Sequence, residues 1–270
     1  MHCRTLNLVA LSFGLAITAT ACSDDATTAS ERPVVEFTAD DTTLTGPTEV
    51  PSGFVDVRIK STGTIGHHLF FARLNDDVTF DEAMTAPDEE FFSNVTLHGG
   101  NGSVAAGTEV SMSLELKPGN YFALDNPQND NPTTAQFTVS KSGSGGREPQ
   151  AKGTVKLGPN MALTVPNGFD AKGVWEFVND DPQETHEAAL VKLAPGKTVA
   201  DIVEWAKAFE GPPPFDGEYG AMGALGPKQR AWITLQPGDP GDYALICLIP
   251  GEEGKPHLLK GMARAVSVRN

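Results

Sequence analysis

Four side chains in the C-terminal half have the types and the order needed to hold a transition-metal ion. Cys247 ends an apolar run, His257 follows after nine intervening residues, and Met262 comes after four more. His186 lies upstream, behind the polar stretch NDDPQET. A thiolate, two imidazoles and a thioether can bind copper in a trigonal set with a long axial sulfur, and such soft donors favour copper over harder ions.

Each of these residues also has an ordinary structural interpretation. A single cysteine is often a small buried hydrophobe. By itself His257 could be a surface loop residue, Met262 a core residue, and His186 a hydrogen-bonded histidine at the start of a strand. The metal-site interpretation therefore depends on all four side chains meeting at one point.

The N-terminus predicts export and lipidation. Arg4 precedes an apolar run over 6–17, which is too short for a permanent membrane span, and residues 19–22 read Ala-Thr-Ala-Cys. Small residues directly before a cysteine resemble a bacterial lipobox, so we expect a signal peptide over 1–21 and lipid on Cys22. Diacylation would anchor the protein stably in the bacterial envelope, on the periplasmic side or at the cell surface. An ordinary cleaved leader is the alternative.

Cysteine and charge counts limit the possible functions. Of three cysteines, Cys3 would leave with the leader and Cys22 would carry lipid, so Cys247 has no disulfide partner in the expected mature chain. The formal net charge of −15 argues against nucleic acid as a partner, since phosphates attract basic surfaces. An acidic surface suits solubility or docking to a basic protein.

The chain divides into two repeated units. A polar tether is expected over 22–32, a first domain over 33–140, a Gly/Ser-rich linker over 141–152, and a second domain over 153–270. Order and turn residues correspond between the units, so that His67 falls opposite His186, and Asp125 opposite Cys247. Such internal repetition indicates a duplicated structural unit.

Within each unit the pattern is mostly that of strands. Residues 54–59 and 110–116 approach alternation of apolar and polar side chains, and 231–235 and 243–248 are further strand candidates. One short helix is expected in each unit; Thr198 and Asp201 would begin the second. Many short strands with one helix per unit predict two tandem β-sandwiches.

The second unit resembles the cupredoxin family of type 1 copper proteins. Gly241-Asp242-Tyr243-Ala244-Leu245-Ile246-Cys247 is similar to the family's Gly-x-Tyr-x-x-x-Cys strand, and Phe177-Val178-Asn179 leading to His186 is similar to its first histidine element. The resemblance implies an all-β fold of two Greek-key sandwiches. It also implies one copper ion held by His186, Cys247, His257 and Met262, with Asn179 and Glu187 orienting the loops around the site.

The first unit departs from this ligand pattern. Asp125 stands where the thiolate is needed, and the following loop has neither histidine nor methionine. We therefore expect no type 1 site there, and a structural or docking role instead. His68, His98 and Met112 could contribute to a second metal site, although nothing in the sequence fixes their geometry.

An enzyme is the weaker interpretation. Multicopper oxidases and nitrite reductases need further histidine pairs, and no His-x-His or His-Cys-His string occurs. No nucleophile elbow, phosphate loop or zinc-protease helix is present either. The sequence favours an electron carrier with an unidentified redox partner. A metal-free partner-binding module and a copper storage or chaperone protein are the alternatives.

Overall fold

The computed structural model describes residues 31–127, 131–142, 145–251 and 254–269. The expected signal peptide, the lipidated Cys22 and nearly all of the tether lie outside these residues. None of the helices described has both the length and the apolar character required to cross a membrane.

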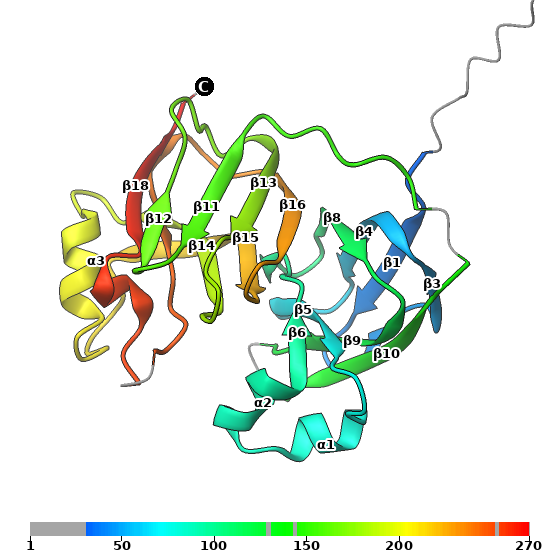
Figure 1. Ribbon diagram of the computed structural model, residues 1–270. Helices are drawn as coiled ribbons and strands as arrows, with labels where there is room; N and C mark the ends of the chain where they lie inside the picture. The colour runs from blue at the N-terminus through cyan, green and yellow to red at the C-terminus, as the bar shows by residue number, and fades with distance from the viewer. Residues whose placement is uncertain (1–30, 128–130, 143–144, 252–253, 270) are drawn as a thin grey trace, which may run out of the picture.

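The first half contains two packed sheets, shown on the right of Figure 1. One sheet segment consists of β1 (Val34–Ala39), β2 (Leu44–Thr45), β4 (Gly53–Ser61) and β8 (Glu109–Leu116). The other consists of β3 (Glu49–Pro51), β5 (His67–Leu74), β6 (Val95–Leu97), β7 (Gly102–Val104), β9 (Gly119–Asp125) and β10 (Thr133–Ser140). Two helices, α1 (Phe80–Thr85) and α2 (Asp88–Asn94), lie beyond the second sheet.

The second half repeats this plan. Its first sheet segment consists of β11 (Thr154–Gly158), β12 (Ala162–Thr164), β13 (Gly173–Asn179) and β16 (Arg230–Leu235). Its second sheet consists of β14 (His186–Leu193), β15 (Phe215–Leu225), β17 (Gly241–Ile246) and β18 (Ala263–Val268). The helix α3 (Val199–Trp205) and the 3-10 turn η1 (His257–Lys260) complete it.

Strand pairing confirms the repeat. β1 runs parallel to β4, as β11 does to β13, and each first strand is edged by a short antiparallel one. The hydroxyl of Tyr121 donates to the carbonyl of Lys117 at 3.0 Å, and that of Tyr243 donates to the carbonyl of Asp239 at 2.7 Å. The expected all-β architecture of two sandwiches is therefore confirmed.

The apolar run of β17 is explained by burial on both faces. Tyr243 and Leu245 point into the core between the sheets, and Cys247 continues this face beyond the strand. Ala244 and Ile246 point outward and pack in a second cluster with Ile202 of α3. Both faces must therefore be apolar, and the period-2 alternation of a half-exposed strand is lost.

The helices differ from expectation in two respects. The first half has two short helices rather than one, because Pro87 cannot continue α1 and instead precedes α2. In the second half α3 begins as expected, with the Asp201 carboxylate accepting from the backbone N–H of Thr198 at 2.9 Å.

The two halves are joined through one continuous sheet. β16 pairs antiparallel with β8, giving an eight-stranded order of β12-β11-β13-β16-β8-β4-β1-β2. The pairs are Ala231 with Leu114, Trp232 with Ser113, and Ile233 with Met112. Because β8 and β16 are equivalent in the repeat, the pairing is symmetric about Ser113 and Trp232. The proposed domain limits remain predictions.

Candidate metal centre

Cys247 lies directly after β17 and is fully buried. Its backbone N–H donates to the carbonyl of Met262 at 3.1 Å, and its own carbonyl accepts from the N–H of Leu258 at 2.9 Å. The returning chain thus holds Cys247 from both sides. It is a free thiol, with no other cysteine among the residues that the structure describes.

His186 opens β14 behind a turn that a buried asparagine organises. The side-chain amide of Asn179 donates to the carbonyls of Glu184 and Leu225, both at 2.8 Å, and its oxygen accepts from the N–H of Asp181 at 2.9 Å. These three bonds close the turn and set where β14 begins. The expected role of Asn179 in orienting this loop remains a prediction, and its bonding partners give that prediction a physical basis.

His257 is the first residue of η1 rather than part of an open loop. Its N–H donates to the carbonyl of Ile249 at 3.0 Å, and its carbonyl accepts from the N–H of Met262 at 3.2 Å. Gly251 passes so close that a Cβ there would lie 3.2 Å from Nε2 of His257. The imidazole is therefore enclosed, and it is fully buried.

Three of the four expected ligands meet at one point. Nδ1 of His186 lies 3.1 Å from Nδ1 of His257, and the latter lies 3.6 Å from the sulfur of Cys247. The ligand atoms of these three residues all lie within 4.8 Å of one another. Metal–nitrogen and metal–sulfur bonds of about 2.0–2.3 Å would span such separations. The residues therefore fit a metal ion.

Met262 reaches the site through its backbone contacts. It is fully buried and is bonded to both Cys247 and His257 through the main chain. Its role as the axial sulfur ligand stays a prediction.

The protonation of the three donors suits metal binding. Burial lowers the pKa of His186 despite the nearby Asp181, and it lowers the pKa of His257 to about 4, helped by His186 and Lys260. Both imidazoles are thus neutral ligands near pH 7. Burial and the neighbouring Glu187 raise the pKa of Cys247 to about 12, so a metal ion must displace the thiol proton when it binds.

Glu187 is linked to the sulfur through its main chain. Its N–H lies 3.4 Å from the Cys247 sulfur, and its carboxylate accepts from the N–H of Leu248 at 2.7 Å. Burial raises the pKa of Glu187 to about 7. The side chain thus ties the start of β14 to the residue after the cysteine, an arrangement compatible with its predicted orienting role.

Two carboxylates beside the imidazoles, Asp181 and Glu184, were not predicted from the sequence. Both belong to the turn between Asn179 and His186, and each faces the outer nitrogen of one histidine. Their only sequence signal was the acidic character of the NDDPQET stretch. Which imidazole each would face depends on the shape of the turn.

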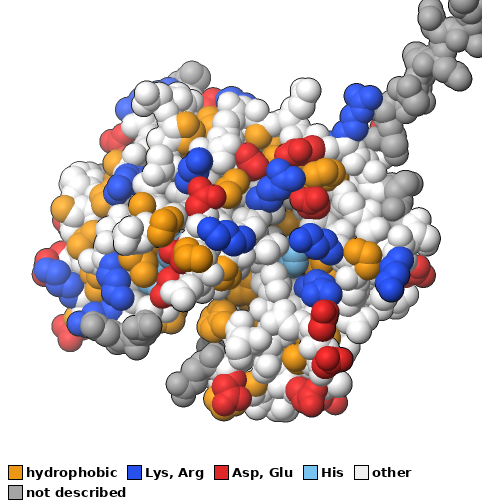
Figure 2. Space-filling view, viewed as in Figure 1, with side chains coloured by type: hydrophobic (Ala, Val, Ile, Leu, Met, Phe, Trp, Pro, Cys, Tyr) orange, Lys and Arg blue, Asp and Glu red, His pale blue; other side chains and the backbone are white. Residues whose placement is uncertain are grey.

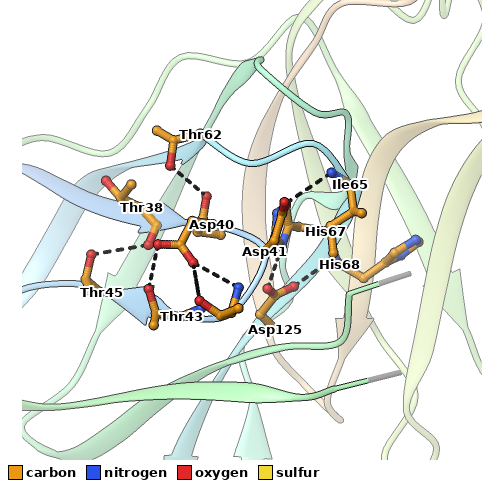
Figure 3. Close-up of polar contacts among 12 residues, drawn as sticks. Thr38, Asp40, Asp41, Thr43, Thr45, Thr62, Ile65, His67, His68 and Asp125 are labelled. Atoms are coloured by element: carbon orange, nitrogen blue, oxygen red, sulfur yellow. Dashed lines mark hydrogen bonds and ion pairs between the residues drawn. The ribbon is translucent and has the colours of Figure 1, made fainter. Parts of the chain in front are cut away.

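The equivalent position in the first half holds a hydrogen-bonded histidine and carboxylate (Figure 3). Nδ1 of His67 lies 2.7 Å from one carboxylate oxygen of Asp125, and the backbone N–H of His68 donates to the other at 3.1 Å. Leu69 pairs with Asp125, and Ala189 pairs with Ile246, so the residue before Ala189 falls opposite Cys247. That residue and Leu69 each lie two positions after the histidine that opens their strand. Asp125 therefore occupies the position that Cys247 has in the other half. Asp125 thus occupies the thiolate position with a hydrogen-bonded carboxylate.

The tentative second metal site has no support in the described residues. Across those residues, the His/Cys/Asp/Glu group with metal-like spacing is His186, Cys247 and His257, and neither His68 nor His98 joins such a group. His98 instead packs against Tyr121 with ring centroids 5.4 Å apart, and Met112 lies in the core.

A pocket of about 410 Å³ lies between the two halves. His68 and Asn126 line it from the first half, and Glu187 and Leu248 line it from the second. Glu187 and Leu248 directly follow His186 and Cys247 in the chain, so the pocket borders the candidate metal centre.

Solved copper proteins are similar to this chain in structure. Auracyanin from Roseiflexus castenholzii is 24% identical over 45% of this chain and 100% of its own, with a TM-score of 0.29. Auracyanin A of Chloroflexus aurantiacus, described as a "blue" copper protein, is 14% identical over 40% of this chain and 98% of its own, with a TM-score of 0.29. The multicopper oxidase Fet3p is 11% identical over 91% of this chain and 67% of its own, with a TM-score of 0.28.

No protein-family model and no curated protein matches the chain. The all-β fold class predicted from the sequence is confirmed by the sheets themselves.

Proposed function

We propose that the second half binds one copper ion through His186, Cys247 and His257, with Met262 as the axial ligand, and that the protein carries single electrons. The observation that carries this proposal is the meeting of two neutral imidazoles and one thiol at a buried point. Packing alone would not require three such donor atoms to face one another. When bound, copper would supply reversible one-electron chemistry.

The protein's own contribution is to hold the donors in nearly one geometry. Cys247 is fixed by main-chain bonds to Met262 and Leu258, and His257 by its bond to Ile249. His186 is fixed by the turn that Asn179 closes. Fixed ligands limit the rearrangement that accompanies a change of charge, which favours electron transfer.

Burial favours a carrier over a copper chaperone. All three donors are fully buried, so releasing the ion to another protein would require the chain around the site to open. Electrons can leave without such opening, because Glu184 is partly exposed and its carboxylate lies 3.8 Å from Nε2 of His257. The metal centre is therefore one side chain away from the surface.

The proposed partner is a basic redox protein. Acidic side chains gather over the lobe formed by α1 and α2, at the bottom of Figure 2. Its exposed members in the described chain include Asp76, Asp77, Asp81, Glu82 and Glu90. Together with the net charge of −15, this surface would attract a cationic protein. The proposed place of this exchange is the bacterial envelope, with the protein anchored by lipid on Cys22.

Copper titration tests the proposal. The chain without residues 1–21, carrying Cys22→Ser, should take up one Cu(II) and develop an intense thiolate-to-copper absorption band. Cys247→Ser should abolish the band, whereas His68→Gln, a histidine outside the cluster, should keep it. A wild-type protein that takes up no copper would overturn the proposal and favour a metal-free module. Copper that binds but cannot be reversibly reduced would favour storage.

A further inference from the structure

The outer nitrogens of both candidate imidazole ligands are buried without a hydrogen-bond partner among the residues that the structure describes. Nε2 of His186 and Nε2 of His257 each lack one. A carboxylate oxygen lies near each: Oδ2 of Asp181 is 3.6 Å from Nε2 of His186, and Oε2 of Glu184 is 3.8 Å from Nε2 of His257. An unpaired buried polar atom destabilises the folded protein. Two such atoms facing two carboxylates therefore need a physical explanation.

Both carboxylates belong to one stiff turn. The other oxygen of Asp181, Oδ1, accepts from the N–H groups of Gln183 and Glu184, both at 2.9 Å. The amide of Asn179 in turn binds the Asp181 N–H and the Glu184 carbonyl. With Oδ1 so occupied, Oδ2 is left facing His186. The turn therefore presents one carboxylate to each imidazole.

The tautomers of the two imidazoles connect these contacts to the metal. In the metal-free site the two Nδ1 atoms lie 3.1 Å apart, so a hydrogen bond between them requires a proton on one of the two atoms. A metal ion takes the lone pairs of both Nδ1 atoms, and each neutral imidazole must then carry its proton on Nε2. Both outer nitrogens would become donors at the same time. A shift of less than about 1 Å would bring each within the usual 2.7–3.2 Å of its carboxylate.

We propose that Asp181 and Glu184 are positioning residues that accept the Nε2 protons of His186 and His257 when the centre holds a metal. This inference rests on the proposed copper site and names what orients it. Each carboxylate favours the tautomer with its proton on Nε2, which leaves the lone pair of Nδ1 for the metal. It also makes the imidazole a stronger electron-pair donor. The added negative charge also favours the more positively charged oxidation state, which lowers the reduction potential.

The two carboxylates should differ in effect. The Asp181 side chain is 7% exposed and is held by two backbone bonds, whereas the Glu184 side chain is 37% exposed. Charges near solvent interact more weakly because water screens them. We therefore expect Asp181 to influence the metal more strongly than Glu184.

Charge-removing variants with nearly unchanged shape provide the test. Asp181→Asn keeps an oxygen that can accept from Gln183 and Glu184, so the turn should survive, and Glu184→Gln changes the partly exposed partner. Glu36→Gln, which removes one exposed charge on β1, is the matched control. Affinity for Co(II), which is independent of redox activity, and the potential of the copper-loaded protein are measured for all four proteins.

Loss of Co(II) affinity of about 10–100-fold is expected for Asp181→Asn, with a smaller loss for Glu184→Gln and none for Glu36→Gln. The potential should rise in the same order. Imidazole nitrogen NMR of the wild type should show protons on both Nε2 atoms after Co(II) is replaced by diamagnetic Zn(II). If Asp181→Asn fails to fold, Glu184→Gln and the NMR measurement decide the question.

Unchanged affinity and potential in both variants would overturn this inference alone. A wild-type protein that binds neither Co(II) nor copper would overturn the proposed copper site as well. The two failures are therefore distinguishable.

Discussion

At the scale of single residues, the buried His98 links protonation to stability. Burial, with smaller effects of Arg73 and Lys117, lowers the pKa of His98 from the usual 6.5 to about 4. Its Nε2 has no hydrogen-bond partner in the part of the chain that the structure describes, so no described acceptor compensates a positive charge there. The unfolded chain therefore binds a proton at a higher pH than the folded chain does. The contribution of neutral His98 to the free energy of unfolding should be fully present above about pH 6.5 and should be lost as the pH is lowered toward 4.

His98→Gln should remove this contribution to acid sensitivity. A depression of this size corresponds to about 3 kcal/mol over the window from pH 6.5 to 4. The measurement is urea unfolding of wild type and variant at several pH values. The stability difference between them should shrink or reverse on acidification. Each protein's own free energy of unfolding at neutral pH is the reference. If the free energies of the two proteins changed with pH in parallel, the prediction would be contradicted.

Met262 can be tested by substituting a side chain of similar volume. In Met262→Leu the core stays filled, so the protein should fold and still take up copper through the remaining three donors. A weak thioether stabilises the oxidised ion, so its loss should raise the reduction potential. Cyclic voltammetry of the loaded variant provides the measurement, and Met112→Leu is the control for a core methionine in the other half. Equal potentials in wild type and Met262→Leu would exclude an axial role.

At the scale of elements, the turn between β13 and β14 places the first histidine. Asn179→Ala would delete three hydrogen bonds of this turn, including those to the carbonyls of Glu184 and Leu225. The expected loss of stability is about 2–4 kcal/mol, together with weaker metal binding because His186 loses its fixed position. Thermal unfolding and Co(II) titration check both effects. Asn120→Ala, an exposed asparagine on β9, is the control.

The strands and three donor residues could be predicted because their signals are local. The run ending at Cys247 is apolar on both faces, and the spacing of His257 and Met262 suits a returning loop. The contact of Asp181 with His186 could not be predicted, because it depends on a turn whose shape Asn179 sets through space. The second helix of the first half was missed although Pro87 marks its start.

The pairing of β16 with β8 could not be predicted from the sequence either. The sequence pattern of a strand does not tell whether water or another strand covers its outward-facing side chains. Trp232 is such a residue; it is nearly fully buried and packs against Phe54, with ring centroids 5.5 Å apart. A tryptophan on the outer face of a predicted strand was the available signal.

At the scale of the whole molecule, the shared sheet should make the two halves unfold together. The β8–β16 pairing and one hydrophobic cluster both include residues from each half. Calorimetry of the metal-free protein should therefore show a single transition. Copper at a hundredfold excess over its dissociation constant should stabilise the whole molecule by about 2.7 kcal/mol. Two separate transitions, with only one responding to copper, would show independent halves.

The symmetry of the β8–β16 pairing has a consequence for solubility. Two equivalent strands that meet antiparallel about one point form a closed, isologous contact, which cannot add further copies end to end. The edges that remain at the two ends of the eight-stranded sheet are β2 and β12, of two and three residues. Such short edges offer little template for strand addition between molecules. The eight-stranded sheet would thereby be kept from joining the sheets of neighbouring molecules.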